Sequence, residues 1–498
     1  MSYNKSKKKI GVFPIVMITV AYASSPSVFP TIAEYGYGVI GLFLITLVLF
    51  LLPMIMTSSE LASTWPSRGG VYTWVKEALP GPFGFVAIWL QFLDIIISSP
   101  ACLTFIAATF AYAVDPKLAE DKYYLMGFIL ISFWMITFIS FFSMKASGWI
   151  NTFGNIFSLF LPMGILIVLV GFWYFSGNST HITSGGDSIF PHINSMGSLV
   201  FYAAILYSFT GLETSASHTP EMINPKKNFA KAMFYAGIIL FVLGFSSLAI
   251  AVIVPSGSIN LASGMMQTFT IGFNRFGLGW LIPIVAVLMS FGTLISLNAT
   301  VIGPSKGLYG ASVDGELPPI LTKENKHGMP VNIFIFQAIV VSLLCLVFIL
   351  MPNVNACYWI IAAIGSASYL CMYVMMFAAV IILRYKKPQV KRGYKIPGGK
   401  LGVWIIAGTG LLTSLFGIAI AFYPPDQIDV GKIWVYELVL IGGVLILAGL
   451  GFVIYIFRKP EWANVKVKDH SICENTNENI ILSSNVKSRF IKKLSSII

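Results

Sequence analysis

Two acidic residues lie deep within long apolar runs of this 498-residue chain. Glu213 ends the segment Ser208-Phe-Thr-Gly-Leu-Glu213, and Asp94 stands in the run Leu90-Gln-Phe-Leu-Asp-Ile-Ile-Ile97. Because a charged side chain facing lipid costs about 2.5–3.5 kcal/mol, we expect Glu213 to face the cavity. There Glu213 could exchange a proton and Asp94 could attract a cation. The alternatives are structural: hydrogen bonding of Glu213 to unwound backbone and of Asp94 to a neighbouring helix.

Hydroxyl groups lie beside possible breaks in two of these runs. Ser25, Ser27 and Thr210 could bind a substrate carboxylate together with the free N–H groups at helix N-termini, whose dipole favours an anion. The alternative is that these hydroxyls cap the broken helix ends, because serine and threonine are favoured cap residues. We therefore predict a polar site at the breaks, with both uses of the hydroxyls left open.

Aromatic rings could wall off one side of a bound ligand. Tyr207 and Phe209 flank the second break, and Tyr369 and Tyr373 are four residues apart, so they share one face of a helix. Packing in a chain that is 14% aromatic is the alternative for all four rings. His218 could sense pH because histidine titrates near neutrality, although a lone histidine at the end of a span often has a structural role.

The elements that position these residues are apolar runs of roughly 20 residues, enough to cross a hydrocarbon core of about 30 Å as a helix. The composition agrees, with 56% apolar and 10% charged residues. Runs that are apolar on every face exclude a membrane barrel of alternating strands. We predict an all-α polytopic membrane protein with 12 transmembrane helices over residues 10–34, 38–58, 82–112, 123–143, 153–176, 196–218, 229–254, 276–304, 331–351, 356–384, 401–424 and 433–457.

Two of the predicted spans are interrupted at corresponding places. The first is broken by Ala23-Ser-Ser-Pro-Ser27 and the sixth by Ser208–Glu213, and these spans lead two successive groups of five. Proline, glycine and serine weaken a helix, and the backbone groups that they free are tolerated in a membrane where they line a polar cavity. A single such break is commonly an ordinary kink. The matched pair instead favours a transporter binding site between broken helices 1 and 6.

The distribution of basic residues predicts the orientation of the chain. Of 32 Lys and Arg residues, only Lys117, Lys122, Arg275 and Lys432 fall on the side opposite the N-terminal tail. The positive-inside rule therefore places both termini in the cytoplasm. The net charge of +12 reports this topology, so we expect no nucleic-acid partner. The five cysteines lack metal-ligand spacing, and we expect no metal and no cofactor.

Several motifs together identify a family. Glu60-Leu-Ala is followed by Gly69-Gly-Val-Tyr-Thr-Trp74, and further segments are Leu206–Pro225, Gly303-Pro-Ser-Lys-Gly-Leu-Tyr309, Tyr369-Leu-Cys-Met-Tyr373 and Ile396-Pro-Gly-Gly-Lys400. With these segments the chain resembles amino-acid permeases of the amino acid/polyamine/organocation superfamily over roughly residues 10 to 460. Within that superfamily it is most similar to the glutamate/GABA antiporters.

The resemblance implies a five-plus-five inverted repeat in the plasma or inner cell membrane that exchanges amino acids by alternating access. It divides the chain into a cytoplasmic tail (1–9), a first repeat (10–195), a second repeat (196–400), two further spans (401–457) and a second cytoplasmic tail (458–498). It implies amino acids and protons as the small-molecule partners, and a proton-linked role for the glutamate that matches Glu213. His218 matches a histidine of the antiporters, and Tyr369 and Tyr373 match a tyrosine pair.

The chain departs from the antiporters at residues expected to contact the substrate. Ser24-Ser25-Pro26-Ser27 replaces a Gly-Ser-Gly-like turn, and Asp94 stands where a glutamine-like residue is usual. Ser296 and Thr300 align with an acidic residue and a tryptophan. The substrate-binding set is thus predicted as Ser24, Ser25, Ser27, Asp94, Tyr207, Phe209, Thr210, Gly211, Glu213, Ser296, Thr300, Tyr369 and Tyr373.

The function predicted from these residues is amino-acid antiport influenced by protons, resembling glutamate/GABA exchange. The alternative is uptake or exchange of a neutral or cationic amino acid or its amine. An intramembrane enzyme is a remote alternative, because the apolar runs lack a nucleophile with its base. A channel is also a remote alternative, because no repeated filter is present.

Glu60 and Lys306 could form an inner gate or simply meet the interface. Val486, Phe490, Leu494 and Ile497 predict an amphipathic helix in the C-terminal tail, for membrane binding or autoinhibition.

Overall fold

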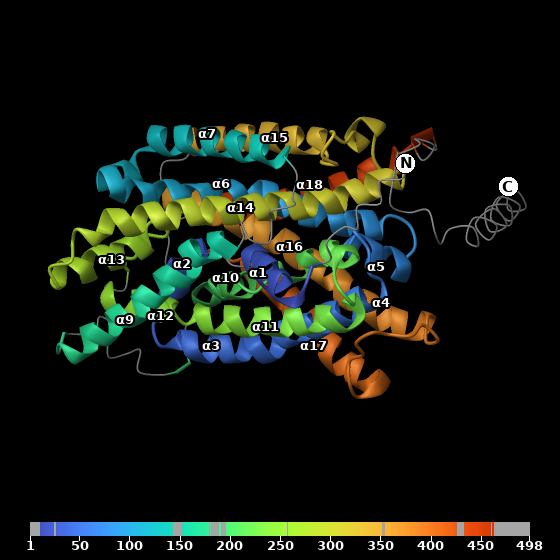
Figure 1. The fold of residues 1–498 in the computed structure, drawn as a ribbon, viewed down its shortest axis with the longest axis horizontal. Coiled ribbons are helices and arrows are strands. Elements are labelled where there is room, and N and C mark those ends of the chain that lie inside the picture. The colour runs from blue at the N-terminus through green and yellow to red at the C-terminus, as the bar shows by residue number, and fades with distance from the viewer. Residues whose placement is uncertain are drawn as a thin grey trace, which may run out of the picture.

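The computed structural model describes residues 10–23, 26–142, 152–178, 180, 189–190, 196–255, 257–350, 354–425, 433–459 and 461–462. Over these residues it is an all-helical bundle whose long helices run side by side (Figure 1). The expected tail 1–9, Ser24 and Ser25, and the expected amphipathic tail helix lie outside the described residues.

Among the first five predicted spans, the third and fourth are continuous helices. The first, second and fifth each contain a 3-10 turn or a π-turn. The first span is α1 (Val12–Ala23), a 3-10 turn (Pro26–Val28) and α2 (Phe29–Ala33), and the second is α3 (Gly38–Thr46), a π-turn (Leu47–Leu51) and α4 (Leu52–Thr64). The third and fourth are α6 (Phe83–Val114) and α7 (Lys122–Ser140). The fifth includes a π-turn (Ile156–Phe160) and α9 (Leu161–Phe175). The first break therefore falls where the sequence predicts it.

The second group begins with the other broken span. The sixth span has a 3-10 turn (Gly197–Leu199), α10 (Tyr202–Tyr207) and a 3-10 segment (Leu212–Glu221). The predicted seventh span corresponds to α11 (Pro225–Gly244) with α12 (Ser247–Ile253). The predicted eighth to twelfth spans correspond to α14 (Leu281–Val313), α15 (Val331–Leu350), α16 (Val354–Lys386), α17 (Gly399–Ala421) and α18 (Ile433–Ile456).

Among the described residues, 11 helical segments are long and apolar enough to cross a membrane. The expected span 331–351 corresponds to α15, whose apolar stretch Val331–Cys345 is shorter than the other 11. The chain is thus a multi-pass membrane protein, and the exact count of 12 spans and the inverted repeat remain predictions.

Two helices outside the predicted spans, and one longer span, differ from the sequence prediction. Short helices α5 (Val71–Ala78) and α13 (Gly264–Arg275) follow the second and seventh spans. They are amphipathic rather than uniformly apolar, so a search for apolar runs passes over them. α14 continues to Val313 instead of ending near residue 304, although Pro304 lies inside it. Next to the proline, the Ser305 hydroxyl donates to the Val301 carbonyl at 2.7 Å.

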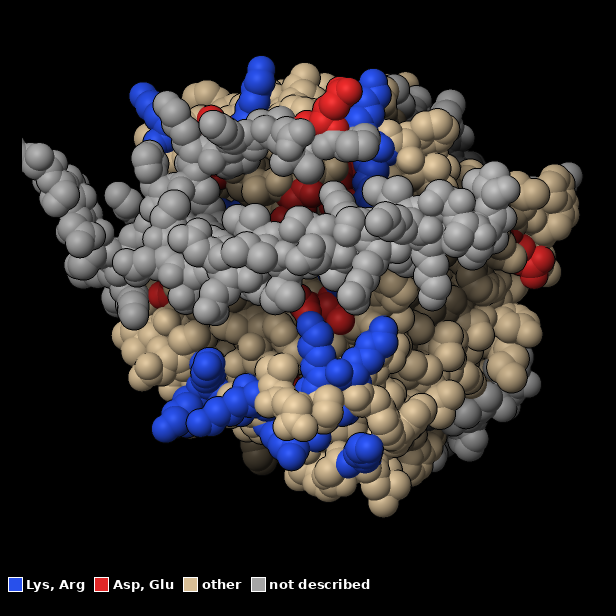
Figure 2. All heavy atoms as spheres, turned by 90° about the vertical axis from the view of Figure 1, so that its right-hand side faces the viewer, with Lys and Arg blue, Asp and Glu red and all other residues tan. Residues whose placement is uncertain are grey.

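Helices α5 and α16 bring many charges to one end of the bundle, at the right of Figure 1. Lys and Arg side chains project from this end, most of them in its lower part (Figure 2). We call it the basic end, and the positive-inside rule predicts that it faces the cytoplasm.

Tyr72 of α5 donates to the Asp314 carboxylate at 2.7 Å. Burial, followed by the Asp314 charge, raises the pKa of Tyr72. The phenol therefore remains a donor that ties α5 to the end of α14.

Candidate substrate site

The two broken spans meet at Gly211. This residue has φ of 93°, and a Cβ atom placed on it would lie 3.0 Å from the Tyr22 carbonyl oxygen and 3.3 Å from Ala23 Cα. A side chain would therefore be strained by the left-handed backbone and would also press on the first span. The Gly211 N–H donates to the Tyr373 hydroxyl at 2.9 Å, so α16 satisfies a backbone group that the break exposes. Gly211 thus fixes the contact between the two breaks.

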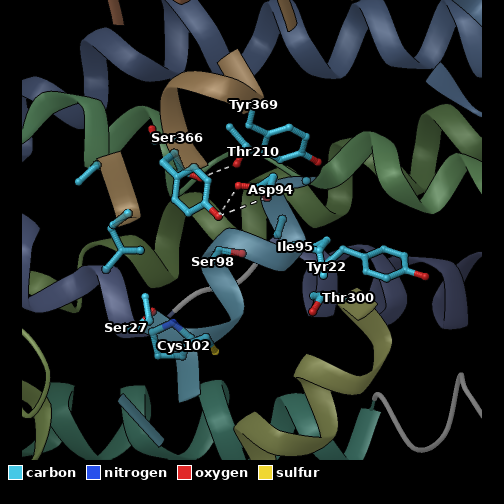
Figure 3. Close-up of a pocket in the computed structure, with 18 of the residues that line it drawn as sticks. Tyr22, Ser27, Asp94, Ile95, Ser98, Cys102, Thr210, Thr300, Ser366 and Tyr369 are labelled. Atoms are coloured by element: carbon cyan, nitrogen blue, oxygen red, sulfur yellow. Dashed lines mark hydrogen bonds between the residues drawn. The ribbon is translucent and has the colours of Figure 1, made fainter. Parts of the chain in front are cut away.

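A cavity lies beside this contact, among α1 and its following turn, α6, α10, α14 and α16 (Figure 3). Its lining includes one residue of the fifth span, Ser158. The structure places eight of the predicted residues on the cavity wall: Ser27, Asp94, Tyr207, Thr210, Gly211, Ser296, Thr300 and Tyr369. Phe209, Glu213, His218 and Tyr373 are absent from that wall. The breaks and the cavity therefore occupy the same region of the bundle.

Asp94 is the only acidic residue on the described cavity wall, and no Lys or Arg lines it. Its side chain is 3% exposed and accepts a hydrogen bond from the Tyr207 hydroxyl, at 3.1 Å to Oδ1 and 3.4 Å to Oδ2. Gly365 of α16 leaves room for this carboxylate, because an added Cβ would lie 3.2 Å from Asp94 Oδ1. One phenol leaves much of the hydrogen-bonding capacity of an ionised carboxylate unused. Asp94 therefore presents to the cavity a carboxyl group whose hydrogen-bonding capacity is only partly used.

Further polar residues on the wall were missed at the sequence level. Ser98 and Cys102 follow Asp94 at spacings of four and eight residues, on the same face of α6, and Figure 3 shows all three at the cavity. Ser366 precedes Tyr369 by three residues on α16, and its buried hydroxyl lacks a hydrogen-bond partner among the described residues. Helical spacing from Asp94 and Tyr369 could have found these residues.

Glu213 differs from the expectation that it faces the cavity, because it lies one layer behind the wall. Its carboxylate is 1% exposed and accepts hydrogen bonds from Tyr369 at 2.6 Å, from Gln91 Nε2 at 2.8 Å and from the Tyr373 hydroxyl. The 3-10 segment that starts after Gly211 turns Glu213 toward these donors. Tyr369 lines the cavity while donating to Glu213, so one phenol joins the buried carboxylate to the site.

The hydroxyls of Thr210, at the second break, and of Thr300, inside α14, both contact helix backbone. Thr210 donates to the Tyr207 carbonyl at 2.7 Å, and Thr300 donates to the Leu297 carbonyl at 2.8 Å. Both threonines line the cavity, but these bonds show that they also satisfy helix backbone. Phe209 points away from the cavity into an aromatic cluster, with its ring centroid 5.4 Å from that of Phe43.

Ser296 belongs to a polar contact between α14, the fifth span and the first span. Its hydroxyl lies 3.4 Å from the Ser158 hydroxyl and donates to Asn155 Oδ1 at 3.4 Å. Asn155 Nδ2 in turn donates to the Met17 carbonyl of α1 at 2.7 Å. This side of the cavity is thus neutral and polar, opposite in character to the wall that carries Asp94.

His218 links the two broken spans outside the cavity. Its Nε2 atom lies 3.0 Å from the Tyr22 hydroxyl, and its Nδ1 atom lies 3.8 Å from a carboxylate oxygen of Glu221. The imidazole is 2% exposed, so a change of its charge would be felt by both spans rather than by solvent. The geometry is compatible with the predicted sensing role and with a structural role alike.

Glu60 holds a loop at the basic end. It is 1% exposed and accepts from Arg384 Nε at 2.6 Å, Arg384 Nη2 at 2.5 Å and the Ile396 N–H at 2.8 Å, while Arg392 Nε lies 2.8 Å away. Glu60 is thus buried against two guanidinium groups, whereas one prediction is that it simply meets the membrane interface. The arginines come from a dense basic segment whose pairing with Glu60 the sequence pattern does not reveal.

Comparison with known proteins settles the family. The family model for amino acid permeases matches residues 10–446, almost the whole described bundle. The chain belongs to the amino acid permease family. This permease is 36% identical over 457 residues to an uncharacterized transporter of Legionella pneumophila, covering 92% of this chain and 98% of the relative. The superfamily resemblance predicted from the motifs is thereby confirmed.

Two further relatives carry names that state substrates. A glutamate/gamma-aminobutyrate antiporter of Lactococcus lactis is 29% identical over 497 residues, with 98% of each chain covered. A probable agmatine/putrescine antiporter of the same species is 23% identical over 402 residues, covering 79% of the permease and 83% of the relative. The permease is therefore an amino-acid transporter by family.

Proposed function

We propose that the permease is a proton-influenced antiporter that exchanges amino acids, or an amino acid and its amine, by alternating access. Two broken helices that meet at a cavity inside the bundle support this proposal, since unwound backbone within a membrane is tolerated where it lines such a site. The name of the Lactococcus lactis antiporter supports exchange as the mode of transport. The two groups of five spans would supply the halves that move against each other.

The substrate assignment rests on Asp94, whose carboxylate has no Lys or Arg beside it on the described cavity wall. A glutamate side chain would bring a second carboxylate to a site where Asp94 is acidic and no described Lys or Arg lines the wall. Leaving a charged group unpaired in a buried site costs free energy of kcal/mol order, so charge placement discriminates between substrates. We therefore assign the site to a neutral or cationic amino acid, or to an amine, in preference to glutamate.

We assign the influence of protons on transport to Glu213, which acts on the cavity through the Tyr369 hydroxyl. An ionised Glu213 accepts hydrogen bonds from two tyrosines and Gln91. After protonation the carboxyl group becomes a donor itself, so one of these hydroxyls must reorient. If Tyr369 reorients, the cavity wall changes with the protonation state. This gives protons a physical route to the rate of transport without direct contact between Glu213 and the substrate.

A counterflow screen in proteoliposomes tests the proposal. Purified permease is reconstituted with an unlabelled internal amino acid, and uptake of labelled external amino acids and their amines is measured with and without the internal substrate. We expect uptake to depend on internal substrate and to be strongest for neutral or cationic compounds. Uptake into empty vesicles at the same rate would identify an uptake permease instead. Preference for glutamate would overturn the substrate assignment.

A further inference from the structure

A second pocket, separate from the substrate cavity, lies at the basic end between α11 and the loop that precedes α17. Lys226, Lys227 and Lys231 of α11 line it on one side, and Gly393 and Tyr394 line it on the other. All three lysines are exposed, and no acidic residue of the described chain lies within ion-pair distance of them. The pocket therefore carries a concentrated positive charge that the described part of the protein does not neutralise.

The loop wall of this pocket is held in place from inside the protein. Gly393 packs against Lys226 so closely that an added Cβ would lie 2.5 Å from the Lys226 carbonyl oxygen. The Tyr394 N–H donates to the Ser63 hydroxyl at 2.8 Å, and the loop continues to Ile396, whose N–H donates to buried Glu60. The pocket is thus formed before any ligand arrives, which lowers the cost of binding.

An apolar stripe leads away from the lysines along α11. Tyr235, Ile238 and Val242 are 56%, 61% and 57% exposed, and their spacing of three and four residues places them on the face that carries Lys231. The membrane segment that starts at Pro225 has 29 residues, or about 43 Å as a helix, against about 30 Å for the hydrocarbon core. The lysines at its start therefore reach the headgroup level while the stripe faces acyl chains.

We propose that this pocket binds an anionic phospholipid of the leaflet at the basic end. The phosphate lies among Lys227, Lys231 and the loop wall, and an acyl chain follows the stripe of Tyr235, Ile238 and Val242. Charge complementarity selects an anionic headgroup, since basic pockets between helices at the cytoplasmic face suit such lipids. The continuous apolar stripe selects a lipid over a soluble phosphate, which would leave these side chains unused.

Native mass spectrometry of the full-length permease in detergent tests the site, with titrations of phosphatidylglycerol, phosphatidylcholine and soluble glycerol phosphate. The test variant is K227Q/K231Q, and the matched control K323Q/K326Q removes the same charge from exposed lysines of the α14–α15 connection. We expect phosphatidylglycerol to bind with roughly 30-fold lower affinity after the loss of two interfacial lysines in the test variant, and with roughly unchanged affinity in the control.

The arms distinguish the possible sources of the phosphate. Wild-type permease should bind phosphatidylglycerol well above phosphatidylcholine, and glycerol phosphate should not compete at equal concentration because it lacks the acyl chain. Equal losses in both variants would mean diffuse charge attraction and would overturn the site. Full competition by glycerol phosphate would show that the pocket recognises a headgroup alone and would overturn the lipid assignment. Unchanged thermal unfolding in phosphatidylcholine establishes that both variants are folded.

Discussion

Glu213→Gln keeps the size and shape of the side chain that Tyr369 and Tyr373 contact, but it removes the group that can gain or lose a proton. The glutamine oxygen can still accept from Tyr369, but its amide nitrogen replaces the oxygen that accepts from Tyr373. The Tyr373 hydroxyl already accepts from Gly211, so it loses its acceptor on this side. A hydrogen bond to a charged group contributes about 1.5–3 kcal/mol, and we expect a loss of stability of about this size in a variant that still folds and inserts.

The kinetic consequence is a flatter dependence of the exchange rate on pH. A rate that requires one proton changes by up to about tenfold per pH unit, which corresponds to about 1.4 kcal/mol. Exchange by the wild-type permease is measured in proteoliposomes from about pH 5 to about pH 8, with equal pH on both sides, where histidine and perturbed carboxyl groups titrate. We expect the Glu213→Gln profile to vary by less than about twofold per unit.

The control is Glu324→Gln, which removes an exposed carboxylate between α14 and α15. It should keep the wild-type profile. If Glu213→Gln transports at a normal rate with an unchanged pH profile, then proton influence does not pass through Glu213, and the role assigned to Tyr369 falls with it.

Two further predictions concern the frame around the site. Gly211→Ala should destabilise the permease by at least about 1–2 kcal/mol, because alanine is strained at φ of 93° and its Cβ presses on the first span. Thermal unfolding measures this loss, with Gly442→Ala as the control because its added Cβ meets no atom within 4 Å. Equal unfolding temperatures for the two variants would refute the prediction. Glu60→Gln should cost about 3–5 kcal/mol by leaving two buried guanidinium groups underpaired. Glu77→Gln, which breaks a half-exposed pair with Lys387, should cost about 0–1 kcal/mol in the same assay; similar losses would contradict the buried clamp.

The sequence predicts the spans and the breaks well because hydrocarbon imposes a simple rule on both. Long apolar runs are needed to cross the core, and Pro26 and Gly211 mark places where the helical ladder must be interrupted. Amphipathic α5 and the continuation of α14 past Pro304 escape that rule, because neither depends on uniform apolarity.

The site is predictable only in part. Asp94 and Tyr369 are detectable as unusual or paired residues in apolar runs, and both line the cavity. The position of Glu213 behind Tyr369 depends on how the 3-10 segment turns after Gly211, which no single-residue preference specifies. The contact of Glu60 with Arg384 joins residues more than 300 positions apart, so local pattern carries no information on it.

Competition in proteoliposomes that contain wild-type permease or Asp94→Asn tests whether Asp94 selects neutral and cationic substrates over glutamate. Exchange of a labelled neutral amino acid is measured against unlabelled lysine, leucine and glutamate, with Asp115→Asn in an exposed turn as the charge-matched control. We expect lysine to compete well for the wild-type permease. In Asp94→Asn its apparent affinity should fall about tenfold or more, equivalent to about 1.4 kcal/mol, while that of leucine changes little. An equal loss for every competitor, or glutamate as the strongest competitor for the wild type, would contradict this selection by Asp94.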